Sequence, residues 1–297
     1  MPAIPYARLL TRVLALAGTN AGTTDSTDLA QIGSLLNGRF RQYFEHYWWP
    51  ETMLCEVRPY RPAYAAGTTY AEGDGVYYAS TGLYYTAVGA TTGNAPGAGA
   101  YWTLLTSIDP AEVPYTATGL TSIGLVRQVS ATDPQGPTGA RRLPFALTGT
   151  GVRVLGDAVP TLPWVWYQKR APDLYGATYS AVATYAAGDM IYFASGTGYY
   201  EGDYWLCLSA TSAAQTPLTH AAKWARQEVP DFLLDPVAYG TAADLYRAGG
   251  KTDLAPYLED KAETTLIGEQ SKVMAMQAQT ASSRRSADYP PSLAPTI

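Results

Sequence analysis

The sequence TYAEGDGVYY at residues 69–78 returns as TYAAGDMIYF at residues 184–193, with six of the ten positions identical. Each copy continues through a glycine turn into a second aromatic stretch, and each ends in a proline-containing loop followed by a tryptophan, Trp102 or Trp224. The shared order of these features predicts two copies of one small three-stranded module of roughly 40 residues. We place the modules at residues 63–107 and 177–227.

A module of this size is too short to bury an ordinary hydrophobic core. The Gly-Asp pairs at residues 73–74 and 188–189 predict a tight turn. The closing tryptophan is expected to pack on the sheet and to take the place of that core. Between the modules, residues 123–129, 143–147, 151–155 and 164–169 read as short strands separated by turn sequences. These strands predict a central antiparallel β domain at residues 108–176.

Both ends of the chain are predicted to be helical. Apolar residues recur every three or four positions from Leu9 to Gly18, and again from Leu29 until Pro50 ends the pattern at Trp49. At the other end, Asp235 with Pro236 predicts a helix start, and Asp253 predicts the cap of a long final helix. Because prolines interrupt residues 286–297, we expect an extended tail there.

These elements predict an α+β protein. Its discontinuous helical bundle would be formed by residues 1–62 and 228–283, with the central β domain and the two modules inserted between them. Residues 284–297 would form the C-terminal tail.

The composition excludes several classes of protein. Charged residues make up 15% of the chain and the net charge is −5, which argues against a charge-rich disordered chain and against a basic nucleic-acid-binding face. Two cysteines are too few for a disulfide scaffold, and two histidines too few for most zinc sites. No apolar run is long enough for a membrane helix, and the N-terminus has no signal-peptide pattern, so synthesis in the cytoplasm is expected.

Catalytic motifs are missing as well. The sequence holds no G-x-S-x-G, H-E-x-x-H or phosphate-binding loop, and neither His46 nor His220 stands beside a nucleophile motif. We therefore expect no enzymatic activity, no cofactor and no metal. A glycosidase, which needs only two carboxylates, stays open at this point.

The repeated pattern of tyrosine, Gly-Asp, strand, proline and tryptophan resembles the small three-stranded chitin- and cellulose-binding modules. That resemblance implies stacking of aromatic rings on sugars, and the candidate carbohydrate-binding residues are Tyr70, Tyr84, Tyr85, Trp102, Tyr185, Tyr199, Tyr200 and Trp224. The alternative is that these rings form the cores of the modules. The sequence favours the core role for the two tryptophans, and it leaves Tyr84, Tyr85, Tyr199 and Tyr200 open.

The chain outside the modules resembles the head-to-tail adaptor proteins of tailed bacteriophages. The likeness rests on residues 35–39 (LLNGR), 124–129 (GLVRQV), 165–173 (VWYQKRAPD) and 237–246. It implies a homo-oligomeric ring of twelve subunits in the neck of the virion, between the portal protein and a tail or nozzle protein. Genomic DNA would pass through this ring without specific binding.

The resemblance also implies that the helical bundle and the tail dock on the portal. The candidate portal-binding residues in the tail are Arg284, Arg285, Tyr289, Pro290 and Pro291. Plain disorder of this tail is the alternative. For the whole protein, the alternative function is that of a carbohydrate-binding virion or surface protein, which would hold a polysaccharide through its two modules.

Overall fold

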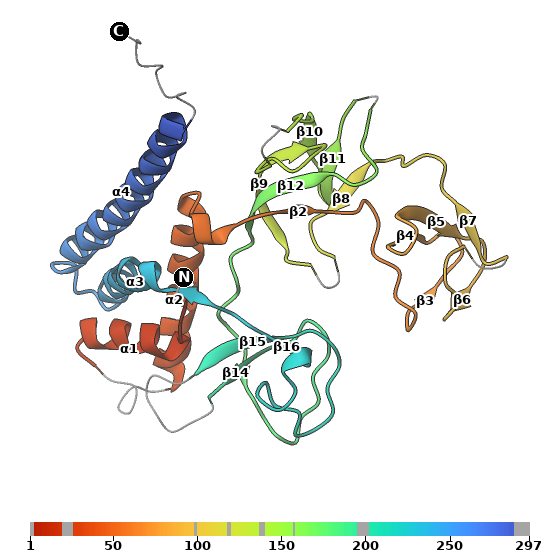
Figure 1. The fold of residues 1–297 in the computed structure, drawn as a ribbon. Helices are drawn as coiled ribbons and strands as arrows, with labels where there is room; N and C mark the ends of the chain where they lie inside the picture. Colours follow the sequence, from red (N-terminus) through yellow and green to blue (C-terminus); the bar gives the residue numbers. More distant parts are fainter. Residues whose placement is uncertain are drawn as a thin grey trace, which may run out of the picture. The chain divides into compact units, whose positions relative to one another are not determined.

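The computed structural model describes residues 3–19, 26–97, 100–117, 120–136, 140–156, 158–194 and 202–287; for residues 26 and 277–287 it describes only the backbone. The described residues form a mixed α+β protein with four α-helices and several small sheets (Figure 1), which confirms the predicted class. The chain divides into two compact units. Unit 1 is Met1–Glu51 with Ala171–Ile297, and unit 2 is Thr52–Arg170. None of the helices in the described ranges has the length and apolarity that crossing a membrane requires.

The two N-terminal helices are α1 (Tyr6–Leu16) and α2 (Ser26–His46). α2 ends three residues before the predicted end at Trp49. The cause is the burial of Trp49, whose indole N–H donates to the carbonyl oxygen of Tyr43 at 3.0 Å. Its ring also packs on Phe232, with the centroids 4.8 Å apart. The helix therefore ends before Trp49, because this side chain is turned into the core.

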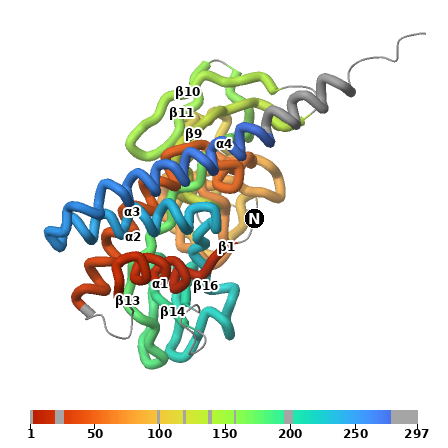
Figure 2. Tube along the Cα trace, turned by 90° about the vertical axis from the view of Figure 1, so that its left-hand side faces the viewer, coloured from red at the N-terminus to blue at the C-terminus, as the bar shows by residue number. Residues whose placement is uncertain are grey.

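The two C-terminal helices are α3 (Leu234–Ala248) and α4 (Ala255–Ala287), and α4 runs alongside α3 (Figures 1 and 2). The predicted cap Asp235 lies inside the first turn of α3, because the short 3-10 helix η3 (Asp231–Leu233) leads directly into it. α4 continues beyond residue 283, where we expected the helical part to stop. The first proline after Pro256 is Pro290, so nothing breaks the helix before Ala287.

All four helices contribute to one hydrophobic core in unit 1. Leu9 of α1, Leu36 and Phe40 of α2, Val237 of α3 and Ala262 of α4 are completely buried members of it. The helices that begin and end the sequence therefore pack together, and neither pair buries its apolar side without the other.

Unit 1 also contains the second module. Its sheet has the order β13-β14-β15-β16, with β13 parallel to β14 and the other pairs antiparallel. The expected three strands are therefore four, because residues 177–178 add to the edge of the sheet. The strands of this region are β13 (Ala177–Thr178), β14 (Met190–Phe193), β15 (Asp203–Cys207) and β16 (Trp224–Arg226), with the 3-10 helix η2 (Ala221–Lys223) and the pair β1 (Ala3–Ile4) and β17 (Val229–Pro230) beside them.

Unit 2 begins with the 3-10 turn η1 (Pro50–Thr52) at its border and holds the central strands. One sheet has the antiparallel order β2-β12-β9 and the other the order β10-β11-β8. Val113, Val152 and Val165 are fully buried in the core that the two sheets share. The strands are β2 (Met53–Val57), β8 (Glu112–Pro114), β9 (Ile123–Ser130), β10 (Phe145–Leu147), β11 (Gly151–Val154) and β12 (Trp164–Lys169).

The first module lies in unit 2. It has a three-stranded antiparallel sheet of order β4-β5-β7, as predicted, and a separate two-stranded pair, β3 with β6. Its strands are β3 (Thr69–Tyr70), β4 (Gly75–Tyr78), β5 (Leu83–Ala87), β6 (Thr91–Thr92) and β7 (Trp102–Leu104).

Candidate functional site

Each module has its own aromatic core, and the arrangement of the rings is the same in both. The rings of Tyr70 and Trp102 lie 5.3 Å apart at 69° in the first module, and those of Tyr185 and Trp224 lie 5.5 Å apart at 67° in the second. Each tryptophan donates its indole N–H to a carbonyl oxygen of the preceding loop, Trp102 to Asn94 and Trp224 to Gln215. The tryptophans therefore act as the cores of the modules.

The Gly-Asp turn is also the same in both copies. The Asp74 carboxylate accepts the backbone N–H of Ala71 at 2.7 Å, and the Asp189 carboxylate accepts that of Ala186 at 2.7 Å. The preceding glycines have φ of +90° and +99°, a conformation that residues with a Cβ rarely adopt. The repeat predicted from the sequence is thus a repeat of structure.

Sequence reasoning missed one member of each core. Tyr64 stacks on Tyr70, and Tyr179 stacks on Tyr185, with 5.7 Å between the centroids in both modules. The sequence contains a signal for this pair: Tyr64 and Tyr179 are 115 positions apart, and so are Tyr70 and Tyr185. Both Tyr64 and Tyr179 have buried hydroxyls without a hydrogen-bond partner among the described residues.

A second face of each module carries a cross-strand tyrosine pair that docks the module on its own unit. In the first module Tyr77 and Tyr84 are partners, and the ring of Tyr60 lies 6.1 Å from that of Tyr84. In the second module Tyr192 and Tyr204 are partners, and the ring of Tyr6 lies 4.7 Å from that of Tyr204. The same face therefore anchors both modules.

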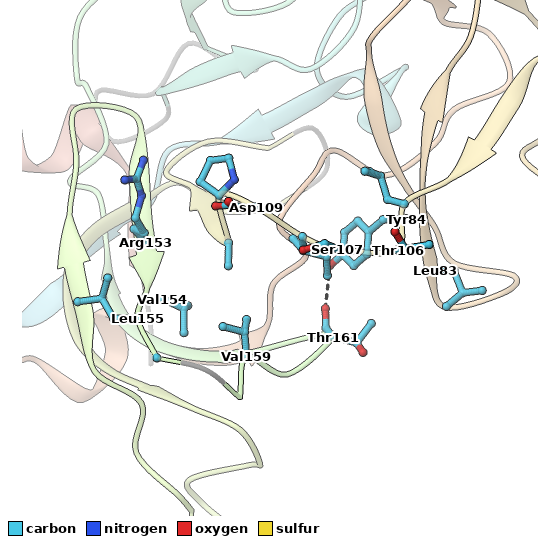
Figure 3. A pocket seen from close by; sticks show the side chains of 15 residues that line it. Leu83, Tyr84, Thr106, Ser107, Asp109, Arg153, Val154, Leu155, Val159 and Thr161 are labelled. Carbon is cyan, nitrogen blue, oxygen red and sulfur yellow. Dashed lines mark hydrogen bonds between the residues drawn. The ribbon is translucent and has the colours of Figure 1, made fainter.

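The structure leaves little of the candidate sugar-binding rings on the surface. Tyr84 is 2% exposed, and its hydroxyl accepts the N–H of Tyr60 and donates to the carbonyl of Thr161 (Figure 3). Tyr185 is half-buried, with its hydroxyl accepting the N–H of Ser180 at 2.7 Å. The other described candidates are buried members of the module cores: Tyr70, Tyr85, Trp102 and Trp224. Apart from the half-buried Tyr185, these rings present no free face on which a sugar could stack.

The remaining candidates fall where the structure gives no side chain. Tyr199 and Tyr200 lie outside the described residues, as do Tyr289, Pro290 and Pro291. Arg284 and Arg285 belong to α4, although their side chains are not among those described.

A cluster of charged side chains joins α2, α3 and α4. The guanidinium of Arg39 donates to both carboxylate oxygens of Asp244, at 2.6 and 2.7 Å, and to both of Glu259, at 2.8 and 2.9 Å. Arg247 contacts the same two carboxylates at 3.0 Å. Burial alone would raise the pKa of Asp244, but the hydrogen bond and charge of Arg39 lower it.

Unit 2 has a buried charge of its own. The side chain of Arg58 is 1% exposed, and its Nη2 lies 2.7 Å from Oε1 of Glu56. The Tyr167 hydroxyl donates to the same carboxylate oxygen at 2.7 Å. Burial raises the pKa of Tyr167, and the hydrogen bond to Glu56 raises it further. This group therefore stays a neutral hydrogen-bond donor, and the cluster is structural.

An open groove of about 710 Å³ lies in unit 2, between the first module and the central strands. Leu83, Tyr84 and Thr161 line one side, and Arg153 and Leu155 line the other (Figure 3). The chain segment at residues 105–111 completes the lining, with Asp109 exposed to solvent. The lining includes no aromatic ring with a free face, so the groove does not fit the predicted sugar-stacking chemistry.

The described part of the chain holds no cluster of metal-ligating side chains. No group of three or more His, Cys, Asp or Glu side chains there could hold a metal ion. Both cysteines are free, and burial raises the pKa of the Cys55 thiol to about 11, which keeps it protonated near neutral pH.

Comparison with known proteins gives no match, whether with family models, with curated proteins or with solved structures.

Proposed function

We propose that this protein is a structural head-to-tail adaptor of a tailed bacteriophage. The observation that supports it is that two of the stretches carrying the adaptor resemblance, residues 35–39 and 237–246, lie against each other in unit 1. The side-chain oxygen of Asn37 accepts the N–H of Leu174 at 2.8 Å, one residue beyond the 165–173 stretch. Arg39, in the 35–39 stretch, binds Asp244 in the 237–246 stretch. Residues far apart in the sequence thus form the joints of one framework.

In this proposal the framework is a discontinuous helical bundle made by the N- and C-terminal helices, with an inserted β domain. The first module belongs to the unit of that domain and the second to the unit of the bundle. The core shared by all four helices supports this description. The close approach of α2 and α3 supports it too, because a Cβ on Gly240 would lie 2.7 Å from the hydroxyl of Tyr43. The second module packs on the core of this framework through Tyr192 and Tyr204.

The adaptor would act as a ring of twelve copies in the neck of the virion, after synthesis in the host cytoplasm. It would bind the portal protein on one side and a tail or nozzle protein on the other, and genomic DNA would pass through it. The end of α4 supports a docking role, because Val273 is the last buried residue among its described side chains and Met274, which follows it, is exposed. The tail residues Arg284, Arg285, Tyr289, Pro290 and Pro291 would then contact the portal. This function needs no catalysis, no cofactor and no membrane.

Gold-labelled antibodies against the purified protein, applied to particles of the phage that encodes it, test the proposal by electron microscopy. We expect label at the collar between head and tail. Label on fibres or at the tail tip would contradict the adaptor role and favour carbohydrate binding. Particles without any label would contradict both functions.

Deletion of residues 284–297 tests the docking role of the tail. We expect the purified protein to keep its thermal unfolding midpoint, because Val273 is the last buried residue among the described side chains of α4, and to lose retention on immobilised portal protein. The matched control lacks only residues 292–297 and keeps all five candidate contacts, so it should be retained. Equal retention of the two deletions would overturn the assignment of these residues.

A further inference from the structure

The groove in unit 2 has a structural counterpart on the second module. The backbone N–H of Leu105 donates to the carbonyl of Tyr84 at 2.9 Å, and that of Gln227 donates to the carbonyl of Tyr204 at 2.8 Å. Tyr84 and Tyr204 hold the same position in the tyrosine pairs that dock the modules. The segment that follows Leu105 along the groove therefore corresponds to the segment that follows Gln227.

The counterpart on the second module is occupied by the start of the chain. Ile4 pairs as a strand with Val229, and the N–H of Tyr6 donates to the Asp203 carboxylate at 2.9 Å. The N–H of Ala7 donates to the carbonyl of Gly202 at 3.0 Å. An extended segment that turns into a helix thus lies where the first module leaves a groove.

Along the groove, the backbone that corresponds to β17 is not paired as a strand within the described residues. Ser107 and Ile108 correspond to Val229 and Pro230, which form β17, yet neither makes a backbone–backbone hydrogen bond within the described residues. Ser107 is exposed and Ile108 half-buried. Free backbone groups along an accessible edge are the feature to which an additional strand pairs.

The side chains at this edge suit an extended segment, because they include no cap for a helix N-terminus. There, the Asp203 carboxylate accepts an N–H of the first turn of α1 and forms an ion pair with Arg226, a combination suited to a helix N-terminus. The corresponding residues of the first module are Leu83 and Leu104, which are 42% and 46% exposed. They suit an apolar side chain of an extended segment, which has no helix N-terminus to cap. Asp109, farther along the groove, forms no ion pair within the described ranges and would complement a basic group.

We propose that this groove binds an extended apolar peptide segment of another protein chain. The segment pairs as a strand with the backbone at Ser107 and Ile108 and places an aliphatic side chain against Leu83, which lines the groove. A basic side chain a few positions along lies near Asp109. This interaction surface is independent of the adaptor function proposed above.

The probe is a synthetic peptide with the sequence PAIPYARLL, residues 2–10 of this chain, which contains the extended segment seated on the second module and an arginine. A free nonapeptide is too short to form a stable helix, so it needs no cap. Fluorescence anisotropy of the labelled peptide with the full-length protein measures binding. We expect saturable binding that Leu83→Glu and Asp109→Lys each weaken at least tenfold. Leu147→Glu is the matched control, because Leu147 is a 63% exposed leucine of the same unit outside the groove.

A second measurement locates the peptide directly. A benzophenone side chain in place of the isoleucine of the peptide should crosslink to residues 105–111, as mapped by mass spectrometry. The proposal is overturned if the peptide does not bind, if Leu83→Glu leaves binding unchanged, if Leu147→Glu weakens it equally, or if the crosslinks map to residues 227–230. Circular dichroism of each variant shows whether it is folded.

Discussion

At the scale of single residues, tyrosine explains much of this protein. The chain has 24 tyrosines and 5 phenylalanines, and the structure gives several of those hydroxyls a definite task. Tyr185 accepts a backbone N–H inside a module core, and Tyr84 links its module to neighbouring backbone. A ring that is apolar on its faces and polar at its tip suits small modules, in which a core side chain is never far from the backbone of a loop.

Two tyrosines in the core of the second module allow a prediction with a matched control. Tyr185→Phe removes the acceptor for the N–H of Ser180 and should destabilise the protein by about 1 kcal/mol. Tyr179→Phe removes a buried hydroxyl that has no partner among the described residues, so it should leave stability unchanged or slightly higher. Scanning calorimetry of the full-length variants measures the difference. A loss of stability in Tyr179→Phe as large as that in Tyr185→Phe would show that the hydroxyl of Tyr179 holds a water molecule or another partner.

At the scale of elements, the joint between α2, α3 and α4 rests on one guanidinium. The side chain of Arg39 is 12% exposed, and its two carboxylate partners, Asp244 and Glu259, are 22% and 33% exposed. The two carboxylates would repel each other without the cations of Arg39 and Arg247 between them. The position of α4 on the other helices therefore depends on charge as well as on its buried apolar residues.

Replacement of this arginine should loosen α4. Arg39→Met leaves the two carboxylates partly buried and without their main partner, and we expect a loss of about 3 kcal/mol, the low end for a buried pair because the carboxylates keep some solvent. Hydrogen exchange along α4 measures the effect. Lys272→Met breaks only an exposed pair with Glu269 on the same helix and should change stability by less than about 1 kcal/mol. Equal effects of the two variants would contradict the role of Arg39.

The same joint predicts a dependence on pH. The pKa of Asp244 in the folded protein is lower than its ordinary value of 3.8, so its contribution to stability is complete above about pH 4 and is lost as the pH falls through the folded pKa. As the pH is lowered through 4, the thermal unfolding midpoint should fall more steeply in the natural protein than in Arg39→Met. Parallel profiles would show that Asp244 is not the group responsible.

At the scale of the whole molecule, the two units differ in how the chain builds them. Unit 2 is one continuous segment, Thr52–Arg170, whereas unit 1 needs both ends of the chain. Unit 2 contains its own core, with Val113, Val152 and Val165 fully buried. A continuous segment with a complete core has what independent folding requires.

Residues 52–170 expressed alone should therefore fold. We expect a cooperative thermal transition and dispersed amide resonances, because the segment cuts through neither the central sheets nor the first module. Circular dichroism and NMR spectroscopy of the fragment check this. A fragment without a cooperative transition would mean that unit 2 depends on unit 1 for stability.

The sequence by itself determined the helices at both ends, the Gly-Asp turns and the existence of two equivalent modules. These features follow from local rules: the spacing of apolar residues, proline and glycine geometry, and the repetition of a pattern. Helix ends depended on packing as well, because α2 ends three residues before the position that Pro50 predicts, where Trp49 is buried against Tyr43 and Phe232.

Only the tertiary structure decided which aromatic faces are covered. Tyr84 and Tyr85 are neighbours on β5 and point to opposite sides of the sheet, so alternation predicts that one side is exposed. Both are buried, because the module core covers Tyr85 and the docking contact with Tyr60 covers Tyr84. The groove, too, is decided only by the tertiary structure. It exists because the place filled by the start of the chain on the second module has no such segment on the first, and no local pattern records that difference.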